Sequence, residues 1–96
     1  MDLAEFQHSL QQVAPPRALG KALQALWWDA RGDWAKAHAC AQEDDGASGA
    51  WVHAYLHRKE GDAENAGYWY ARAAKPPAKE TLDAEWRAIL RALLAA

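Results

Sequence analysis

The amino-acid sequence predicts an all-α fold of about six helices, and three observations support that prediction. Alanine, the strongest helix former and a poor strand former, supplies 24 of the 96 residues. Glycine and proline fall in short clusters that divide the chain into six segments of helical length. Apolar side chains in those segments recur every three or four residues, as in an amphipathic helix. At about 150 residues per domain, the chain forms one domain, residues 1–96.

The two terminal segments each predict a helix with one apolar face. Residues 2–14 form the first, and its stripe has spacings of three and four residues: Leu3, Phe6, Leu10 and Val13. Residues 81–95 form the last, with Thr81 as a candidate N-cap. The stripe of this last helix consists of Leu82, Trp86, Ile89, Leu90 and Leu93.

Between these segments, two Gly-Asp pairs predict the turns of two helical hairpins. We expect Pro16 in the first turn of the second helix, where a backbone N–H has no partner to lose. The stripe of that helix consists of Leu19, Leu23, Leu26, Trp27 and Ala30. In Gly32-Asp33 and Gly61-Asp62, the glycine is expected to end one helix and the aspartate to cap the next. Helices joined by so short a turn lie antiparallel.

The two hairpins repeat at an offset of 29 residues. Residues 26–37 align with residues 55–66, because both carry aromatic and aliphatic side chains, then Gly-Asp, then alanine four residues after the aspartate. A helix pair repeated within about 20–50 residues is typical of an α-solenoid. We therefore predict a short right-handed solenoid, with repeat one at about 17–45, repeat two at about 46–75, and the first and last helices as caps.

The second repeat resembles the tetratricopeptide and Sel1-like superfamily. The run Ala66–Ala74 resembles the Sel1-like signature A-x-x-W-Y-x-x-A-A, and the segment Gly61–Ala66 resembles the turn of a tetratricopeptide repeat. The chain departs from the family at Ala41, which replaces the signature tyrosine in repeat one, and at His53 and His57, where the family usually has leucine and tyrosine. The resemblance implies a scaffold that binds segments of other proteins and has no chemistry of its own.

Composition excludes several classes of function. The net charge of −2, from 11 basic and 13 acidic residues, provides no electrostatic footprint for nucleic acid. No apolar run reaches the roughly 18–20 residues that span a bilayer, so no membrane association is expected. The N-terminal residues lack the apolar stretch of a secretion signal, so we expect a cytoplasmic protein. A single cysteine, Cys40, excludes an internal disulfide and is expected to act as a small buried hydrophobe.

Most tryptophans lie on the apolar stripes and are expected in the core: Trp27, Trp34, Trp69 and Trp86. On the fifth helix, the pattern predicts that Trp69 is largely buried and that Tyr68 is more exposed. Trp28 lies opposite the stripe of its helix. Either a second neighbouring helix covers Trp28, or it faces a partner.

A candidate partner-binding surface combines aromatic and basic side chains. Trp51, Tyr55, Arg58 and Lys59 match the inward face of the first helix of a repeat, which in the family contacts the ligand. With Trp28, these residues could bind the carboxylates and apolar side chains of a protein or peptide. The alternative is that Trp51 and Tyr55 belong to the core, while the two cations stabilise the C-terminal end of a helix.

Two histidines at a spacing of four residues, His53 and His57, lie on one face of the fourth helix. Such a pair can share a metal ion, with His38 or Glu60 as a third ligand. The alternative is a pair of histidines that form hydrogen bonds between packed helices. Because a pair without an evident third ligand is weak evidence, our interpretation assigns no metal, no cofactor and no enzymatic activity.

The sequence therefore predicts a small protein-interaction module whose partner is a protein or peptide. Two alternatives stay open. One is a helical protein that binds a metal or a small molecule through His38, His53 and His57. The other is an accessory subunit that forms a homodimer through exposed aromatic side chains.

Overall fold

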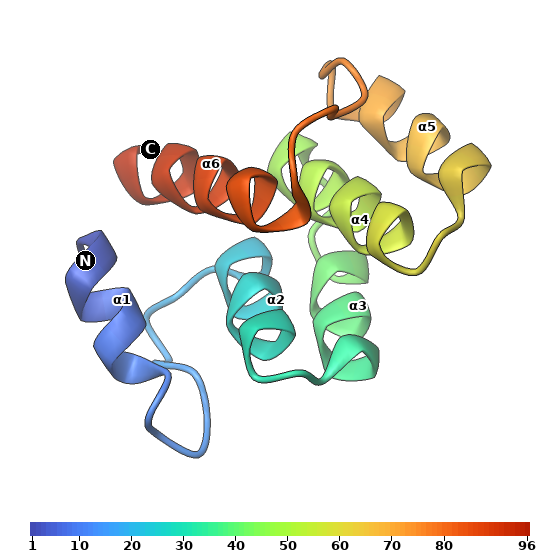
Figure 1. Ribbon diagram of the computed structural model, residues 1–96. Coiled ribbons are helices and arrows are strands. Elements are labelled where there is room, and N and C mark those ends of the chain that lie inside the picture. The colour runs from blue at the N-terminus through green and yellow to red at the C-terminus, as the bar shows by residue number, and fades with distance from the viewer.

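The structure, a computed structural model that describes residues 1–96, contains six α-helices and no strand (Figure 1). The predicted all-α class is therefore confirmed. The helices are α1 (Leu3–Ser9), α2 (Lys21–Ala30), α3 (Trp34–Gln42), α4 (Ala47–Lys59), α5 (Ala63–Arg72) and α6 (Leu82–Ala95). None of them is long and apolar enough to cross a membrane.

The first two helices are shorter than predicted. Helix α1 ends at Ser9, and Val13 lies beyond it with 89% of its surface exposed. The residues after Ser9 are held out of the helix by Arg31 of the next hairpin, whose guanidinium donates to the backbone carbonyls of Leu10 and Gln12. Helix α2 begins only at Lys21, with Gly20 as its N-cap. Pro16 lies in a separate turn before α2 and is not in the helix, which corrects the prediction.

The two Gly-Asp turns have the same geometry, as predicted. Gly32 and Gly61 adopt positive φ angles of 79° and 89°, a conformation that glycine adopts without steric cost. In both turns the backbone N–H of the aspartate donates to the carbonyl five residues earlier at 2.9 Å. The side chains of Asp33 and Asp62 each accept from the backbone N–H three residues later. Each turn therefore ends one helix and starts an antiparallel partner.

Helix α4 lies at the centre of the fold and contacts α2, α3, α5 and α6. Helices α5 and α6 lie on different sides of α4 (Figure 1), and they meet through a side-chain hydrogen bond from the Tyr70 hydroxyl of α5 to the Glu85 carboxylate of α6. The largest fully buried side chains come from α1, α2, α4 and α6: Phe6, Leu26, Trp27, Val52, Leu56, Ile89 and Leu90. The core is therefore built around α4.

The two terminal helices contact each other, whereas we expected them at opposite ends of the repeats. The rings of Phe6 in α1 and Trp86 in α6 pack edge to face at 6.0 Å. The apolar stripe of α6 is buried at Ile89 and Leu90, so α6 crosses the first helix of each hairpin instead of extending the stack beyond α5. The right-handed solenoid stays a prediction.

Candidate functional site

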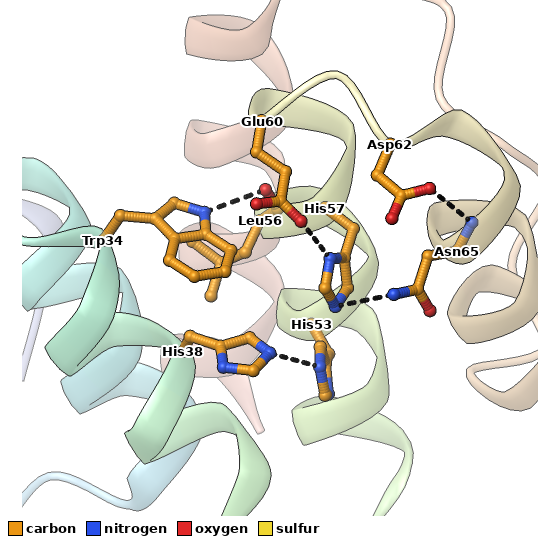
Figure 2. A network of polar contacts seen from close by, with 8 residues as sticks. All are labelled: Trp34, His38, His53, Leu56, His57, Glu60, Asp62 and Asn65. Atoms are coloured by element: carbon orange, nitrogen blue, oxygen red, sulfur yellow. Dashed lines mark hydrogen bonds and ion pairs between the residues drawn. The ribbon is translucent and has the colours of Figure 1, made fainter.

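Three of the four histidines gather between α3 and α4 (Figure 2). His38 comes from α3, and His53 and His57 come from α4, one helical turn apart. The Nε2 atoms of His38 and His53 are 2.9 Å apart. One ring nitrogen of each histidine lies within 4.8 Å of the corresponding atoms of the other two. His53 and His57 are only 4% and 6% exposed, and His38 is half-buried.

Local sequence accounts for this placement. Residues four apart on a helix share a face, so His53 and His57 both face α3 and α5. The Gly-Asp turn returns the chain antiparallel to α2 and thereby positions α3 against α4. Small side chains at this junction, Ala37 and Ala41, are buried, which allows a close approach of the helices. His38, one residue after Ala37, then reaches the face that carries the other two histidines.

Two tryptophans hold two of the imidazole rings. Trp34 stacks on His38 with ring centroids 4.7 Å apart and planes at 10°. The indole N–H of Trp34 donates to the carbonyl of Leu56 at 3.0 Å, which fixes the indole against α4. Trp69 stacks on His53 at 3.9 Å and 15°. Both imidazoles are therefore restricted in rotation before any ligand arrives.

The third imidazole, that of His57, is oriented by hydrogen bonds at both ring nitrogens (Figure 2). Its Nδ1 is 2.6 Å from Oε1 of Glu60, and its Nε2 is 3.4 Å from the amide nitrogen of Asn65. A carboxylate accepts hydrogen bonds and does not donate them, so Nδ1 of His57 carries a proton. In the neutral ring this leaves a lone pair on Nε2, which accepts from the Asn65 amide and lies at the edge of the ring toward the other histidines.

Burial makes the charged form of the His53 and His38 rings unfavourable. Burial, followed by the positive charges that His38 and His57 would carry, lowers the pKa of His53 to about 4. Burial, followed by the charge on His57, also lowers the pKa of His38. At neutral pH both rings are therefore uncharged. One Nε2 donates to the other across their 2.9 Å contact, so the donating ring must move its proton to Nδ1 before both Nε2 atoms can coordinate a cation.

Three predicted partner-binding residues on α4 form hydrogen bonds or ion pairs with other residues of the chain. Tyr55 is 2% exposed, and its hydroxyl donates to the Asp29 carboxylate at 2.8 Å. Burial, and then the charge of Asp29, raises the pKa of Tyr55. The Lys59 ammonium donates to the other oxygen of Asp29 at 2.9 Å. Arg58 donates to Glu85 at 2.8 Å and to the backbone carbonyl of residue 80.

The two predicted partner-binding tryptophans are half-buried, on different helices. Trp28, on α2, packs edge to face on Trp27 at 5.0 Å, and the ammonium of Lys36 lies 4.3 Å from its ring centroid. Trp51, on α4, has the ammonium of Lys75 over its ring at 4.3 Å. Neighbouring side chains of the same chain therefore cover part of both rings.

The fifth helix has the predicted phase, but its tryptophan is less buried than expected. Tyr68 is 56% exposed, whereas Trp69 is half-buried. Helix α6 packs against α2 and α4 and does not stack on α5, and the ring of Trp69 rests on an imidazole of α4.

Sequence reasoning identified the three histidines but missed the residues that orient them. The spacing of His53 and His57 was a usable signal, and His38 and Glu60 were both candidate third ligands. The structure places Glu60 against Nδ1 of His57 instead of among the three ring nitrogens. Nothing in the pattern singled out Trp34 or Asn65 as neighbours of the cluster.

No family model, curated protein or solved structure matches the chain. The resemblance to tetratricopeptide and Sel1-like repeats therefore stays a prediction.

Proposed function

We propose that this protein binds one divalent transition-metal ion through His38, His53 and His57. The observation that supports the proposal is the convergence of three imidazole nitrogens, from two helices, within 4.8 Å of one another. Sequence spacing alone linked two of them. The third, His38, comes from the other hairpin. It supplies the third ligand that the pair of His53 and His57 lacks on its own.

The distances suit an ion after small ring movements. Zinc–imidazole bonds of about 2.0–2.1 Å at tetrahedral angles place two ligand nitrogens about 3.4 Å apart. The nitrogens of His38 and His53 are 2.9 Å apart, slightly closer than this, and the third lies within 4.8 Å of both. Rotations about the side-chain torsions, each moving a ring nitrogen by about 1 Å or less, would therefore complete the site.

The ligand type selects the class of metal. Neutral imidazole suits zinc, copper, nickel, cobalt and iron, whereas magnesium and calcium prefer oxygen ligands. No carboxylate belongs to the set formed by the three histidines. We therefore expect binding of Zn²⁺, Co²⁺, Ni²⁺ and Cu²⁺, with Cu²⁺ the tightest, and no binding of Mg²⁺.

Glu60 acts as a positioning residue for this site. Metal-bound histidines commonly donate the N–H of the other ring nitrogen to a carboxylate, which fixes the tautomer and raises the basicity of the ligand. The 2.6 Å contact between Nδ1 of His57 and Glu60 has this form. Removal of such a partner typically weakens metal binding about 10- to 100-fold, and we expect a loss in this range for Glu60→Ala.

A purely structural role for the histidines predicts different behaviour on exposure to zinc. The protein is equilibrated with Zn²⁺ and desalted, and zinc per chain is measured by mass spectrometry. We expect one equivalent in the wild type, none in the double variant His53→Gln/His57→Gln, and one in His8→Gln, which changes an exposed histidine on α1. A wild type that retains no zinc, or a double variant that retains a full equivalent, would refute the metal function.

A second candidate is the predicted protein-interaction module, favoured by a cavity of about 350 Å³ between α1, α2, α4 and α6. Two of the predicted partner-binding residues, Tyr55 and Lys59, line it together with Trp86 and Arg87. A protein partner that binds there should lose affinity in Arg87→Glu and keep it in Arg91→Glu, one turn further along the same helix. Equal affinity for both variants would exclude this cavity. A homodimer and a cytoplasmic location stay predictions.

A further inference from the structure

We infer that the metal ion keeps one exchangeable coordination position, which takes water or a small monodentate anion beside Asn65. The inference rests on the proposed metal function and concerns what the bound ion can hold. It assigns to the site a class of exogenous ligand that the protein itself does not supply.

The chain provides three ligands at this point and no fourth. The only other group of metal-ligating side chains is His57 with Glu60 and Asp62. Glu60 in that group contacts Nδ1 of His57, at the opposite edge of the ring from Nε2. Cys40, on α3, belongs to neither group, and burial raises the pKa of its thiol. A four-coordinate ion bound by the three imidazoles must therefore complete its shell with a ligand from solution.

Sites of this kind differ from structural zinc sites. A structural zinc ion is usually enclosed by four protein ligands, whereas an ion with three protein ligands keeps a position for water or substrate. Here the histidines come from two helices only, and the third neighbouring helix, α5, presents Asn65 and Trp69 at a spacing of four residues. Neither an amide in this position nor an indole replaces a fourth histidine or cysteine.

Asn65 is placed to hold an exogenous ligand. Its amide nitrogen is 3.4 Å from Nε2 of His57, the ring nitrogen at the edge toward the other two histidines, and without an ion the Nε2 lone pair accepts from this amide (Figure 2). When this lone pair binds the ion, the amide N–H loses that acceptor. A water, hydroxide or anion on the ion would offer the amide a new acceptor. Asn65 is therefore a positioning residue for the fourth ligand.

One side of the histidine cluster, at His53, borders a cavity. A cavity of about 290 Å³ is lined by His53 and Trp69 on the side of the cluster and by Asp44, Asp45 and Arg72 on the outer side. Its volume exceeds the roughly 30 Å³ that one water occupies in the liquid. A small ligand of two or three atoms therefore has room to approach the ring of His53, whereas His38, His57 and Asn65 do not line this cavity.

Charge favours an anion in the fourth position. Three neutral imidazoles leave the full charge of a divalent ion uncompensated in a largely buried place. Glu60 offsets part of it through His57, but it does not reach the ion. A monovalent anion lowers the remaining charge. In the exchange, one water leaves the metal as the anion binds, and the oxidation state of the metal does not change.

Cobalt(II) provides the probe, because its visible spectrum reports the number and type of ligands. The full chain is loaded with one equivalent of Co²⁺ and titrated with sodium azide. We expect a saturable spectral change with isosbestic points. In Asn65→Ala the azide dissociation constant should rise about 2- to 10-fold, the range that corresponds to one net hydrogen bond. Glu64→Ala, an exposed neighbour on the same helix, serves as the control and should match the wild type.

The outcomes separate this inference from the proposed function. Stoichiometric Co²⁺ binding with a spectrum that azide does not change would overturn the exchangeable position and leave the metal function intact. An azide response of equal affinity in Asn65→Ala and wild type would overturn the role of Asn65. Failure to bind Co²⁺ would overturn both, since the exchangeable position requires the ion.

Discussion

The two helical hairpins, α2–α3 and α4–α5, have the same type of turn but carry different side chains on their first helices. Their Gly-Asp turns have the same glycine conformation and the same hydrogen bonds. Yet Gln24 and Trp28 occupy the positions in α2 that His53 and His57 occupy 29 residues later in α4. The hairpin geometry is thus repeated, while the metal-ligating side chains on the first helix occur once.

The difference shows that the site belongs to the junction between the hairpins and to neither hairpin alone. His38 lies on the second helix of the first hairpin, and its two partners lie on the first helix of the second. The equivalent junction beyond α5 does not form, because α6 crosses to the other side of α4 (Figure 1). The fold therefore offers one place where a third histidine can meet an i, i+4 pair.

Helix α4 also supplies the cations that neutralise buried carboxylates of two neighbours. Lys59 pairs with Asp29 of α2, and Arg58 pairs with Glu85 of α6. Tyr55 and Tyr70 donate to the same two carboxylates. Removal of either cation would leave a buried negative charge with less compensation. These residues fix the packing of α4 against α2 and α6, and the histidines take no part in these ion pairs.

The largest expected effect contrasts a tryptophan from each hairpin. Trp27 is fully buried, and its indole N–H donates to Ser9 at 3.1 Å, whereas Trp69 is half-buried. We expect Trp27→Ala to lower the free energy of unfolding by about 3–5 kcal/mol and Trp69→Ala by roughly half as much. Urea denaturation of both variants measures the difference. An equal loss in the two would mean that the hairpins contribute to the core more evenly than their burial indicates.

Zinc should stabilise the fold through both hairpins at once. At a free Zn²⁺ concentration about 100 times the dissociation constant, binding adds about 2.7 kcal/mol, which raises the melting temperature of a domain of this size by about 10 °C or more. His38→Gln in the first hairpin should abolish most of this shift, and so should His53→Gln in the second. His8→Gln should retain it. A full zinc-dependent shift in His38→Gln would place the ion on one hairpin only.

Acid should destabilise the metal-free protein through protonation of the buried histidines between α3 and α4. The pKa of His53 is lowered to about 4 in the folded protein and is about 6.5 in the unfolded chain, so the unfolded chain binds the proton first as the pH falls. Stability is therefore fully present above about pH 6.5 and declines between about 6.5 and 4. The charges facing His53 come from His38 and His57, and Glu60 faces His57.

Chemical denaturation at several pH values in the presence of a chelator measures this decline. His53→Gln should show a shallower loss of stability over the same range, and His8→Gln should follow the wild type. If the free energy of unfolding of His53→Gln followed the same pH dependence as the wild type from pH 7 to pH 4, burial of His53 would not be the cause of the acid sensitivity.

The smallest expected effect is a loss of stability of equal size when either turn glycine is replaced by alanine. Alanine at either turn glycine must adopt a positive φ, and a Cβ at Gly32 or Gly61 meets no atom within 4 Å. The cost is therefore one of backbone conformation, about 1 kcal/mol for each variant. Equal losses for Gly32→Ala and Gly61→Ala, measured by thermal unfolding, would support equivalent turns. A difference of several-fold would show that the two hairpins use the turn differently.

Local signals predicted the turns and helix types, and contacts distant in sequence defined the rest. Gly-Asp and Thr81 act on the backbone within three to five residues, so their roles could be inferred from sequence. The predicted start of α2 was wrong, because proline is equally compatible with a turn that precedes the helix, and Pro16 lies in such a turn. The position of α6 depends on packing against α4 and α2, which no local pattern encodes.

Only the part of the candidate site that depends on local sequence could be predicted. The spacing of His53 and His57 places both on one face of any helix. His38 joins them only after two hairpins have packed, and Trp34, Trp69 and Asn65 enter through the same tertiary contacts. Four of the five predicted partner-binding residues, all except Trp28, were matched to an inward face by analogy with the family. Their charges are satisfied by buried carboxylates that lie about thirty residues away in the chain.

X-ray absorption at the zinc edge tests the central claim most directly, because it reports the ligands of the ion itself. For the protein loaded with one equivalent of zinc, we expect scattering from three imidazole rings at about 2.0–2.1 Å, with one further light-atom ligand at a similar distance and no sulfur. His38→Gln should leave two imidazoles. A wild-type spectrum with sulfur at about 2.3 Å, or with fewer than three imidazoles, would contradict a metal site built where the two hairpins meet.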